Sequence, residues 1–349
     1  MKNLTINFFT FIFLLLTLNA AAQESVEAED ITPLSITGNV DAYYRYSNNK
    51  VGAKTSYTDA AQGFSLGMAN ICFAKEVGKV GFVADIMFGP RANATNYYYT
   101  GSLVAIKQLY VTYKPTEKAK FTFGNFMTYF GYELVEASNN LNYTMSYNYT
   151  NGPFFHTGVK LDYQFTPKFG GMLGVFNAQD TKIDNGKKYV GGQLSYIDGG
   201  FKVYLNGLTG KNDVGDTTGR RYNTLGLTAS YQVAPKFGVA VDVLSLTTRL
   251  KDSTNNVFGT AIYANYAASD KFTLAARYEI FQDKDNYTGI GALGDTFTAF
   301  TLSGNIKIDA LTIIPEITVG SDVKKKFLTD LGVAKKSETA FILAVVYKF

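Results

Sequence analysis

The sequence predicts an all-β fold: a single-chain, antiparallel transmembrane β-barrel of about 16 strands, within a range of roughly 14 to 18, with short periplasmic turns and longer extracellular loops. Three observations predict this fold. The chain begins with an export signal, its segments alternate apolar and polar residues with a period of two, and its last segment ends on Phe349 without a polar tail.

The N-terminus has the organisation of a secretory signal peptide. Lys2 supplies a positive charge, residues 8–18 are apolar apart from two threonines, and Ala20, Ala21 and Ala22 form a small-residue cleavage site. The apolar run is too short for a comfortable membrane-spanning helix, so strands are expected to cross the membrane. We expect cleavage after Ala22, which gives a signal peptide over 1–22, an acidic periplasmic tail over 23–33 and a barrel over 34–349.

The composition excludes several classes of function. Aromatic residues make up 15% of the chain, with 25 Tyr, 27 Phe and no Trp, and the mean hydropathy is −0.03, as expected when strands face both lipid and water. A net charge of +4 is too small for a nucleic-acid binder. The single cysteine, Cys72, excludes an intramolecular disulfide framework, and the single histidine, His156, excludes multi-histidine metal sites. No cofactor is expected.

Short turns and longer polar loops divide the chain into strands. Three of the turns place a Tyr and a Phe six residues apart, at Tyr163 and Phe169, Tyr231 and Phe237, and Tyr266 and Phe272. These residues predict an aromatic belt at one membrane boundary, where the ring is apolar and the hydroxyl stays wet. The predicted strands are 34–46, 63–76, 80–88, 103–113, 120–130, 153–165, 169–177, 188–198, 201–210, 220–233, 237–248, 257–267, 272–282, 295–309, 311–320 and 338–349.

Alternation assigns side chains to the two faces of the barrel. Lys160 and Asp162 alternate with apolar residues in one strand, and Arg277 and Glu279 do so in another, so all four are expected to line the lumen. A soluble β-sandwich would show the same alternation, and the signal peptide, the aromatic rims and the terminal Phe349 favour the barrel. Tyr347 and Phe349 resemble the C-terminal assembly signal of outer-membrane barrels.

Three features depart from a regular barrel. Lys107 falls among apolar residues of a lipid-facing row, which predicts a bulge or a position near a rim. Pro315 cannot donate a ladder hydrogen bond, which also predicts a bulge. The inward positions of the last strand, Ile342, Ala344 and Val346, are apolar, so a further segment is expected to pack against them from inside.

Strand number links the fold to a function, because a barrel of sixteen to eighteen strands leaves an aqueous channel. The long connection 131–152 carries Glu133 and Glu136 among Asn and Tyr, and is the candidate to fold into the lumen and narrow it. An outward surface loop is an equally weighted alternative for this segment. The connection 89–101 is expected to be a surface loop.

Several stretches together resemble those of the OmpL-like β-barrel porins of Gram-negative outer membranes. They are ITGNVDAYY at 36–44, FSLGMA at 64–69, GKVGFVAD at 78–85, AIKQLYVTY at 105–113, GYEL at 131–134, NYTMSY at 142–147, TNGPF at 150–154 and HTG at 156–158. The resemblance implies an outer-membrane porin and gives no substrate and no functional residues.

The predicted function is a channel for passive diffusion of small polar solutes or ions, with outer-membrane lipid and the barrel-assembly machinery as partners. A homo-oligomer is compatible with this fold, and no nucleic-acid partner is expected. The alternative is a non-conducting barrel whose loops bind a partner or ligand. An enzyme is not expected, because His156 is the one imidazole that could serve as a base, and a lone His lining a wet lumen is more often a satisfied polar residue.

Overall fold

The computed structural model describes residues 32–49, 55–58, 62–184, 186–211, 218–251, 253–288, 295–322, 324, 327–328 and 331–349. The expected signal peptide, its cleavage site and the tail up to residue 31 lie outside the described residues. Among the described residues, no helix is long and apolar enough to cross a membrane.

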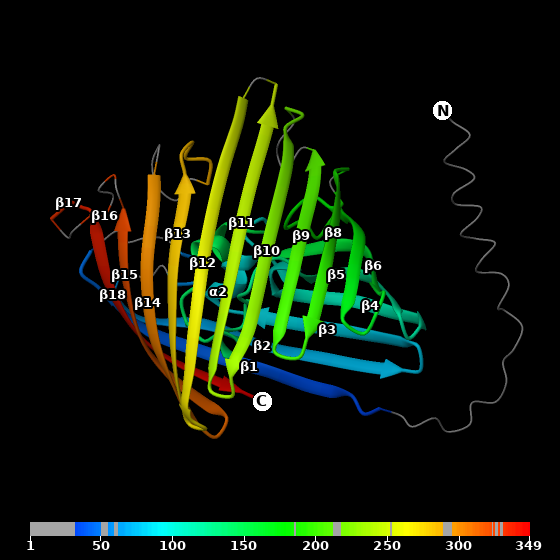
Figure 1. Cartoon of the computed structure of the whole chain (residues 1–349), viewed down its shortest axis with the longest axis horizontal. Coiled ribbons are helices and arrows are strands. Elements are labelled where there is room, and N and C mark those ends of the chain that lie inside the picture. The colour runs from blue at the N-terminus through cyan, green and yellow to red at the C-terminus, as the bar shows by residue number, and fades with distance from the viewer. Residues whose placement is uncertain are drawn as a thin grey trace, which may run out of the picture. The chain divides into compact units, whose positions relative to one another are not determined.

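Sixteen antiparallel strands close into a barrel, in which each strand pairs with its sequence neighbours and β18 pairs with β1 (Figure 1). The predicted fold is therefore confirmed. The barrel strands are β1 (Ser35–Ser47), β2 (Gly63–Val77), β3 (Val80–Phe88), β4 (Ile106–Thr116), β5 (Ala119–Met127), β6 (Phe155–Gln164), β7 (Phe169–Asn177), β8 (Lys188–Asp198), β9 (Phe201–Lys211), β10 (Arg221–Ala234), β11 (Phe237–Leu250), β12 (Ser253–Ser269), β13 (Phe272–Asp283), β14 (Asp295–Ile308), β15 (Leu311–Asp322) and β18 (Ser337–Lys348).

The remaining elements lie in the longer connections. Two very short strands pair with each other between β15 and β18, and the helices occupy the connections before β4 and β6. Because helix α3 immediately precedes β4, that strand begins later than the predicted residue 103. These elements are α2 (Pro90–Thr95), α3 (Ser102–Ala105), η1 (Ala137–Asn139), α4 (Tyr147–Asn151), β16 (Phe327–Leu328) and β17 (Ala334–Lys335).

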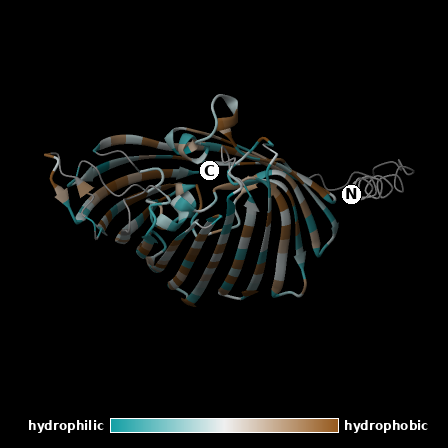
Figure 2. Ribbon diagram, turned by 90° about the horizontal axis from the view of Figure 1, so that it is seen from above, coloured by the Kyte–Doolittle hydropathy of each residue, from teal (hydrophilic) through white to brown (hydrophobic). Residues whose placement is uncertain are grey.

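Apolar and polar residues alternate along the strands, visible as bands of contrasting colour in Figure 2. In β13, Leu274, Tyr278 and Ile280 are exposed on the outside, whereas Arg277 and Glu279 are buried on the lumen side. Exposing this apolar outer face to water would be unfavourable. In a bilayer the face contacts hydrocarbon, and the closed barrel leaves no strand edge with unpaired backbone groups.

One end of the barrel, here called the turn end, carries short turns. The longer connections lie at the other, the loop end, together with the short connection 251–252 between β11 and β12. The residues of the predicted aromatic pairs are exposed, and two of them, Phe237 and Tyr266, are register partners on neighbouring strands. Phe201 and Tyr231 are register partners whose ring centroids lie 6.1 Å apart. The predicted aromatic belt is therefore present at the turn end.

The C-terminal strand closes the barrel. Gly38 and Phe349 exchange two backbone hydrogen bonds of 3.0 Å, and the outward side chains of β18 from Phe341 to Phe349 are exposed. The inward residue Ile342 packs in an apolar cluster with Tyr143 and Ala137 of the connection 131–152. The expectation that a segment packs against this strand from inside is confirmed.

One predicted irregularity is confirmed and the other is wrong. The β3–β4 register shifts where Asp85 pairs with Gln108 and Ile86 with Ile106, so Lys107 is the extra residue of a bulge and turns into the lumen. Pro315 causes no register shift with either neighbour. The ladder with β14 simply lacks the pairs around Pro315, because the missing N–H removes a bond without adding a residue.

Candidate functional site

The connection 128–154 between β5 and β6 folds into the lumen, and its central part is called here the in-folded segment, residues 129–152. Its buried residues Val135, Tyr143 and Met145 are in contact with residues of the barrel wall and of α2. Residues 131–152 therefore fold into the lumen and do not form the outward surface loop that was the alternative. Figure 1 shows helix α2 amid the barrel strands, and its residues Arg91 and Ala92 are fully buried.

Local sequence signals shape the in-folded segment. The Asn140 side chain closes a tight loop, donating to the Leu134 carbonyl at 2.6 Å and accepting from the Leu134 N–H at 2.9 Å. Ser146 caps α4 by accepting the Tyr149 N–H at 3.0 Å. Gly131 has φ 83°, a left-handed conformation that favours glycine, where the chain turns inward.

Arg277 on β13 holds the segment from one side. Its guanidinium donates to Glu133 at 2.7 Å, to Glu279 at 3.1 Å and to the Thr144 carbonyl at 2.5 Å, and all of these side chains are buried. Glu279 also accepts the Tyr147 N–H at 2.7 Å. Three of the predicted residues, Glu133, Arg277 and Glu279, therefore meet in one buried network, with two carboxylates around one cation.

Glu316 on β15 forms a second anchor that the sequence analysis missed. Its carboxylate accepts the backbone N–H groups of Tyr143 at 2.6 Å and Thr144 at 3.0 Å. It also accepts the hydroxyls of Thr144 and Ser303, at 2.5 and 2.6 Å. A carboxylate with four donors on it fixes the peptide backbone of the in-folded segment against the wall.

Arg91 of α2 forms a third anchor, also missed. It is fully buried, donates to the Val135 carbonyl at 3.0 Å and lies 3.5 Å from the Asp41 carboxylate on β1. Its guanidinium lies 4.7 and 5.3 Å from the ring centroids of Tyr57 and Tyr143. The connection 89–101 is therefore not a plain surface loop as expected, because Arg91, Ala92, Thr95 and Asn96 are buried, and Arg91 contacts the in-folded segment.

Glu136 and Lys107 form a fourth contact. The Lys107 ammonium is paired with both Asp85 and Glu136, and Asp85 also accepts from the Asn70 amide at 2.9 Å. The bulge in β4 thus places a buried cation where it meets one carboxylate of the wall and one of the in-folded segment. Glu136 lies in this cluster and Glu133 in the Arg277 network.

Lys160 and Asp162 lie apart from these anchors. They pair with each other at 2.8 Å on β6, toward the turn end, and both side chains remain partly exposed. Asp162 lines a turn-end cavity of about 280 Å³, together with Lys118, Lys120 and Gln193. The sequence-predicted lumen residues therefore divide into a set that anchors the in-folded segment, of which Glu133, Arg277 and Glu279 are buried, and a water-accessible pair toward the turn end.

Glycines on the lumen face of the wall make room for the segment. A β-carbon on Gly191 would collide with the Tyr129 hydroxyl, and one on Gly226 with the Phe130 ring. On β12, a β-carbon at Gly259 would collide with the Asn148 amide. The segment therefore reaches β8, β10 and β12 as well as β13 and β15, and so extends across the lumen.

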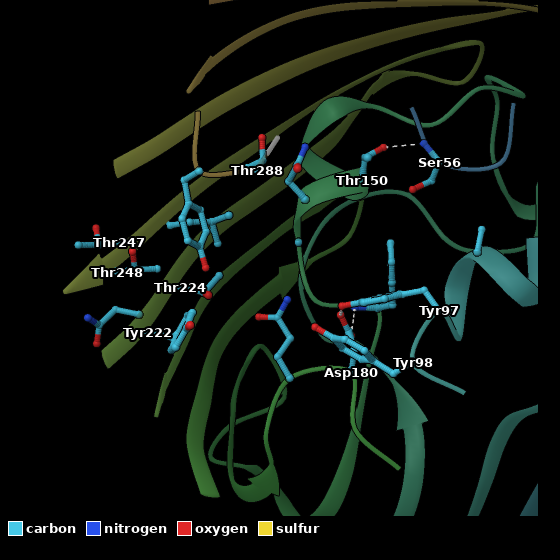
Figure 3. A pocket seen from close by; sticks show the side chains of 18 residues that line it. Ser56, Tyr97, Tyr98, Thr150, Asp180, Tyr222, Thr224, Thr247, Thr248 and Thr288 are labelled. Atoms are coloured by element: carbon cyan, nitrogen blue, oxygen red, sulfur yellow. Dashed lines mark hydrogen bonds between the residues drawn. The ribbon is translucent and has the colours of Figure 1, made fainter. Parts of the chain in front are cut away.

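A loop-end cavity of about 430 Å³ lies between the in-folded segment and the wall (Figure 3). Tyr222, Thr224 and Thr248 belong to strands β10 and β11 on one side, and Tyr97 and Asp180 belong to connections on the other. Cavities therefore remain in the barrel toward both ends, on either side of the anchored region.

The family was identified by comparison with known proteins. A family model described as "Putative beta-barrel porin-2, OmpL-like" matches residues 33–349, which is nearly the whole chain. The chain belongs to this family. It is an outer-membrane β-barrel of porin type and not an enzyme. No curated protein matches the sequence.

Solved structures agree on the fold at low sequence identity. An anion-selective porin from Comamonas acidovorans has a TM-score of 0.65 and 12% identity, covering 91% of this chain and 99% of that one. The outer-membrane channel DcaP of Acinetobacter baumannii has a TM-score of 0.63 and 14% identity, covering 93% and 99%. OprB of Pseudomonas putida has a TM-score of 0.61 and 12% identity, covering 90% and 94%.

The environment of His156 differs from that of a catalytic base. The imidazole is buried among Tyr129, Phe126 and Phe176, and its Nε2 lies 3.3 Å from the Thr128 hydroxyl. Within the part of the chain that the structure describes, no three His, Cys, Asp or Glu residues group as a metal site. His156 is a packed lumen residue beside the in-folded segment.

Lys182 is expected to make the docking of its connection, residues 178–187, depend on pH. Lys182 lies 4.1 Å from the Phe155 ring centroid and donates to Asn96, and burial lowers the pKa of its ammonium from 10.5 to about 8. Between these pH values the folded connection binds fewer protons than the unfolded one, so its docking becomes more stable as pH rises through this window.

We expect hydrogen exchange of residues 178–184, corrected for its intrinsic pH dependence, to slow between about pH 7.5 and 9.5 in the native protein. Lys182→Met removes the titrating group and should abolish this slowing. A native profile identical to that of the variant would contradict the assignment.

Proposed function

We propose that this protein allows passive diffusion of small polar solutes or ions through a water-filled lumen that the in-folded segment narrows. The observation that carries the proposal is the position of that segment, which reaches strands on several sides of the barrel while cavities remain toward both ends. Residues 131–152 then form the constriction, and Glu133, Glu136, Arg277 and Glu279 hold it in place.

We propose that Lys160 and Asp162, the water-accessible pair on β6, determine the electrostatic potential that ions meet at the turn end. Lys160 and Asp162 are partly exposed to the lumen, so their charges act on passing ions with less compensation than the buried networks do. Removing the Lys160 charge should leave Asp162 with the more distant Lys120 ammonium, 4.0 Å away, as its cationic neighbour, and so favour cations.

Planar-bilayer recordings of the purified protein test the proposal. We expect stepwise conductance from the native barrel, and a reversal potential shifted toward cation selectivity in Lys160→Met under a KCl gradient. Lys236→Met, in an exposed turn, is the matched control and should leave the reversal potential unchanged. A closed trace from protein that still changes its gel mobility on boiling would favour the non-conducting, partner-binding alternative.

The finer statements on location and assembly belong to the same proposal. The signal peptide is proposed to be cleaved after Ala22, the short turns to face the periplasm, and Tyr347 with Phe349 to be read by the assembly machinery. A similar structure, OmpT of Vibrio cholerae, is described in a trimer form, with a TM-score of 0.60 and 14% identity, covering 92% of this chain and 100% of that one. Self-association of this chain is proposed on the same fold, and the mass of the purified protein after subtraction of the bound detergent measures it.

A further inference from the structure

We infer that the loop-end cavity is a binding site for a neutral, polyhydroxylated solute of the oligosaccharide class. The inference rests on the proposed function, because it names the kind of solute that the channel would take up at its loop end. The cavity volume of about 430 Å³ lies within the range of small-molecule sites.

The lining carries many hydrogen-bonding groups and little charge. Nine of the 18 described lining residues are Ser, Thr, Asn or Gln, and four are Tyr. Hydroxyl and amide groups both donate and accept, which matches the hydroxyls of a sugar. An ion would leave its hydration shell here without an opposite charge to replace it.

Asp180 is the one charged side chain among the described lining residues, and the protein already uses it. One oxygen accepts the N–H groups of Phe154 and Phe155, at 2.7 and 3.2 Å, and the other accepts the Tyr97 hydroxyl at 3.1 Å. The carboxylate thus positions a wall of the cavity and offers little free charge to a cation.

Aromatic rings supply the apolar part of the site. Tyr97 and Tyr98 remain 50% and 44% exposed, although their ring centroids lie only 4.2 Å apart. Figure 3 shows them on the loop side, across the cavity from Tyr222 on the strand side. Sugar rings present C–H faces as well as hydroxyls, and such faces pack on exposed aromatic rings.

Thr248 provides an independent sign that a polar partner belongs here. Its side chain lines the cavity, the residue is 4% exposed, and its hydroxyl has no hydrogen-bond partner among the described residues. An unpaired buried hydroxyl is unfavourable, and a solute hydroxyl in the cavity would satisfy it.

Binding is tested by calorimetry on the full-length barrel with maltotriose as the probe. The detergent must carry no sugar headgroup, so an amine oxide replaces the common maltosides. We expect saturable binding by the native protein, a loss of about three- to tenfold in affinity for Thr248→Val and about tenfold for Tyr98→Ala. Thr260→Val, on a part of β12 outside the cavity lining, is the matched control and should bind as the native protein does.

The outcomes separate this inference from the proposed function. Absence of maltotriose binding by a barrel that conducts would overturn the inference and leave the channel intact. Binding by a barrel that does not conduct would support the site and contradict diffusion. Tighter binding of sodium glucuronate or of lysine than of maltotriose would also overturn the assignment, because it would show a charged preference.

Discussion

Arg277→Met is expected to release the in-folded segment from β13 and raise the single-channel conductance. The substitution removes the cation between Glu133 and Glu279 and leaves two buried carboxylates facing each other. Removing one partner of a buried ion pair is unfavourable by about 3 to 5 kcal/mol, which would shift the ratio of docked to released segment by about a hundredfold or more.

Two measurements check this expectation. Bilayer recordings should show larger or more frequent open steps in the variant, and limited proteolysis should cut within 131–152 where the native protein resists. Arg249→Met removes an exposed arginine near the loop end of β11 and should change neither property. Should Arg277→Met not fold, Glu133→Gln is a milder change that acts in the same direction. Native conductance and native protease resistance in a folded Arg277→Met barrel would contradict the anchoring role.

Arg91→Met is expected to free α2 and the start of the in-folded segment from β1. The change leaves the buried Asp41 carboxylate without its cation and removes the contacts with the Tyr57 and Tyr143 rings. The same reasoning gives a loss of about 3 to 5 kcal/mol in the stability of this docking. Hydrogen exchange over residues 89–101 should become faster, while the barrel strands keep their protection.

A double variant separates charge from packing. Asp41→Asn combined with Arg91→Met removes both charges, and a neutral pair in place of a buried ion pair is often close to neutral in stability. We therefore expect exchange over 89–101 to return part of the way to the native rate. Equal exchange rates in Arg91→Met and in the double variant would contradict this explanation. They would show that the unpaired Asp41 carboxylate is not the cause of the destabilisation in Arg91→Met.

Most of the barrel could be predicted from the sequence because lipid and water impose a period of two on every strand. All sixteen barrel strands were predicted, and the misplacement of Lys107 in its row correctly indicated a bulge. The apolar inner row with Ile342 correctly indicated a segment packed against β18. Pro315 was misjudged, since losing one donor does not require an extra residue in the strand.

The contents of the lumen were less predictable, because irregular chain has no period. Glu133 and Glu136 stood out as charges in a polar loop, yet nothing in their spacing indicated that one meets Arg277 and the other Lys107. Asp41 and Glu316 occupy inward positions of alternating strands and could have been added to the lumen set on that ground. Arg91 lies in a short helix without any repeat, and only the three-dimensional packing reveals it.

The glycines of the wall would determine the shape of the pore if the in-folded segment were deleted. Gly191, Gly226 and Gly259 leave hollows on the β8–β12 side that Tyr129, Phe130 and Asn148 fill. Deleting the segment would therefore produce a bore that is off-centre, wider along this arc than along β13 to β15, where Arg277 and Glu316 project inward. Large solutes would then travel along the glycine arc, past Asp242 and otherwise mainly uncharged side chains, while Arg277 and Glu316 opposite would act on them from a greater distance.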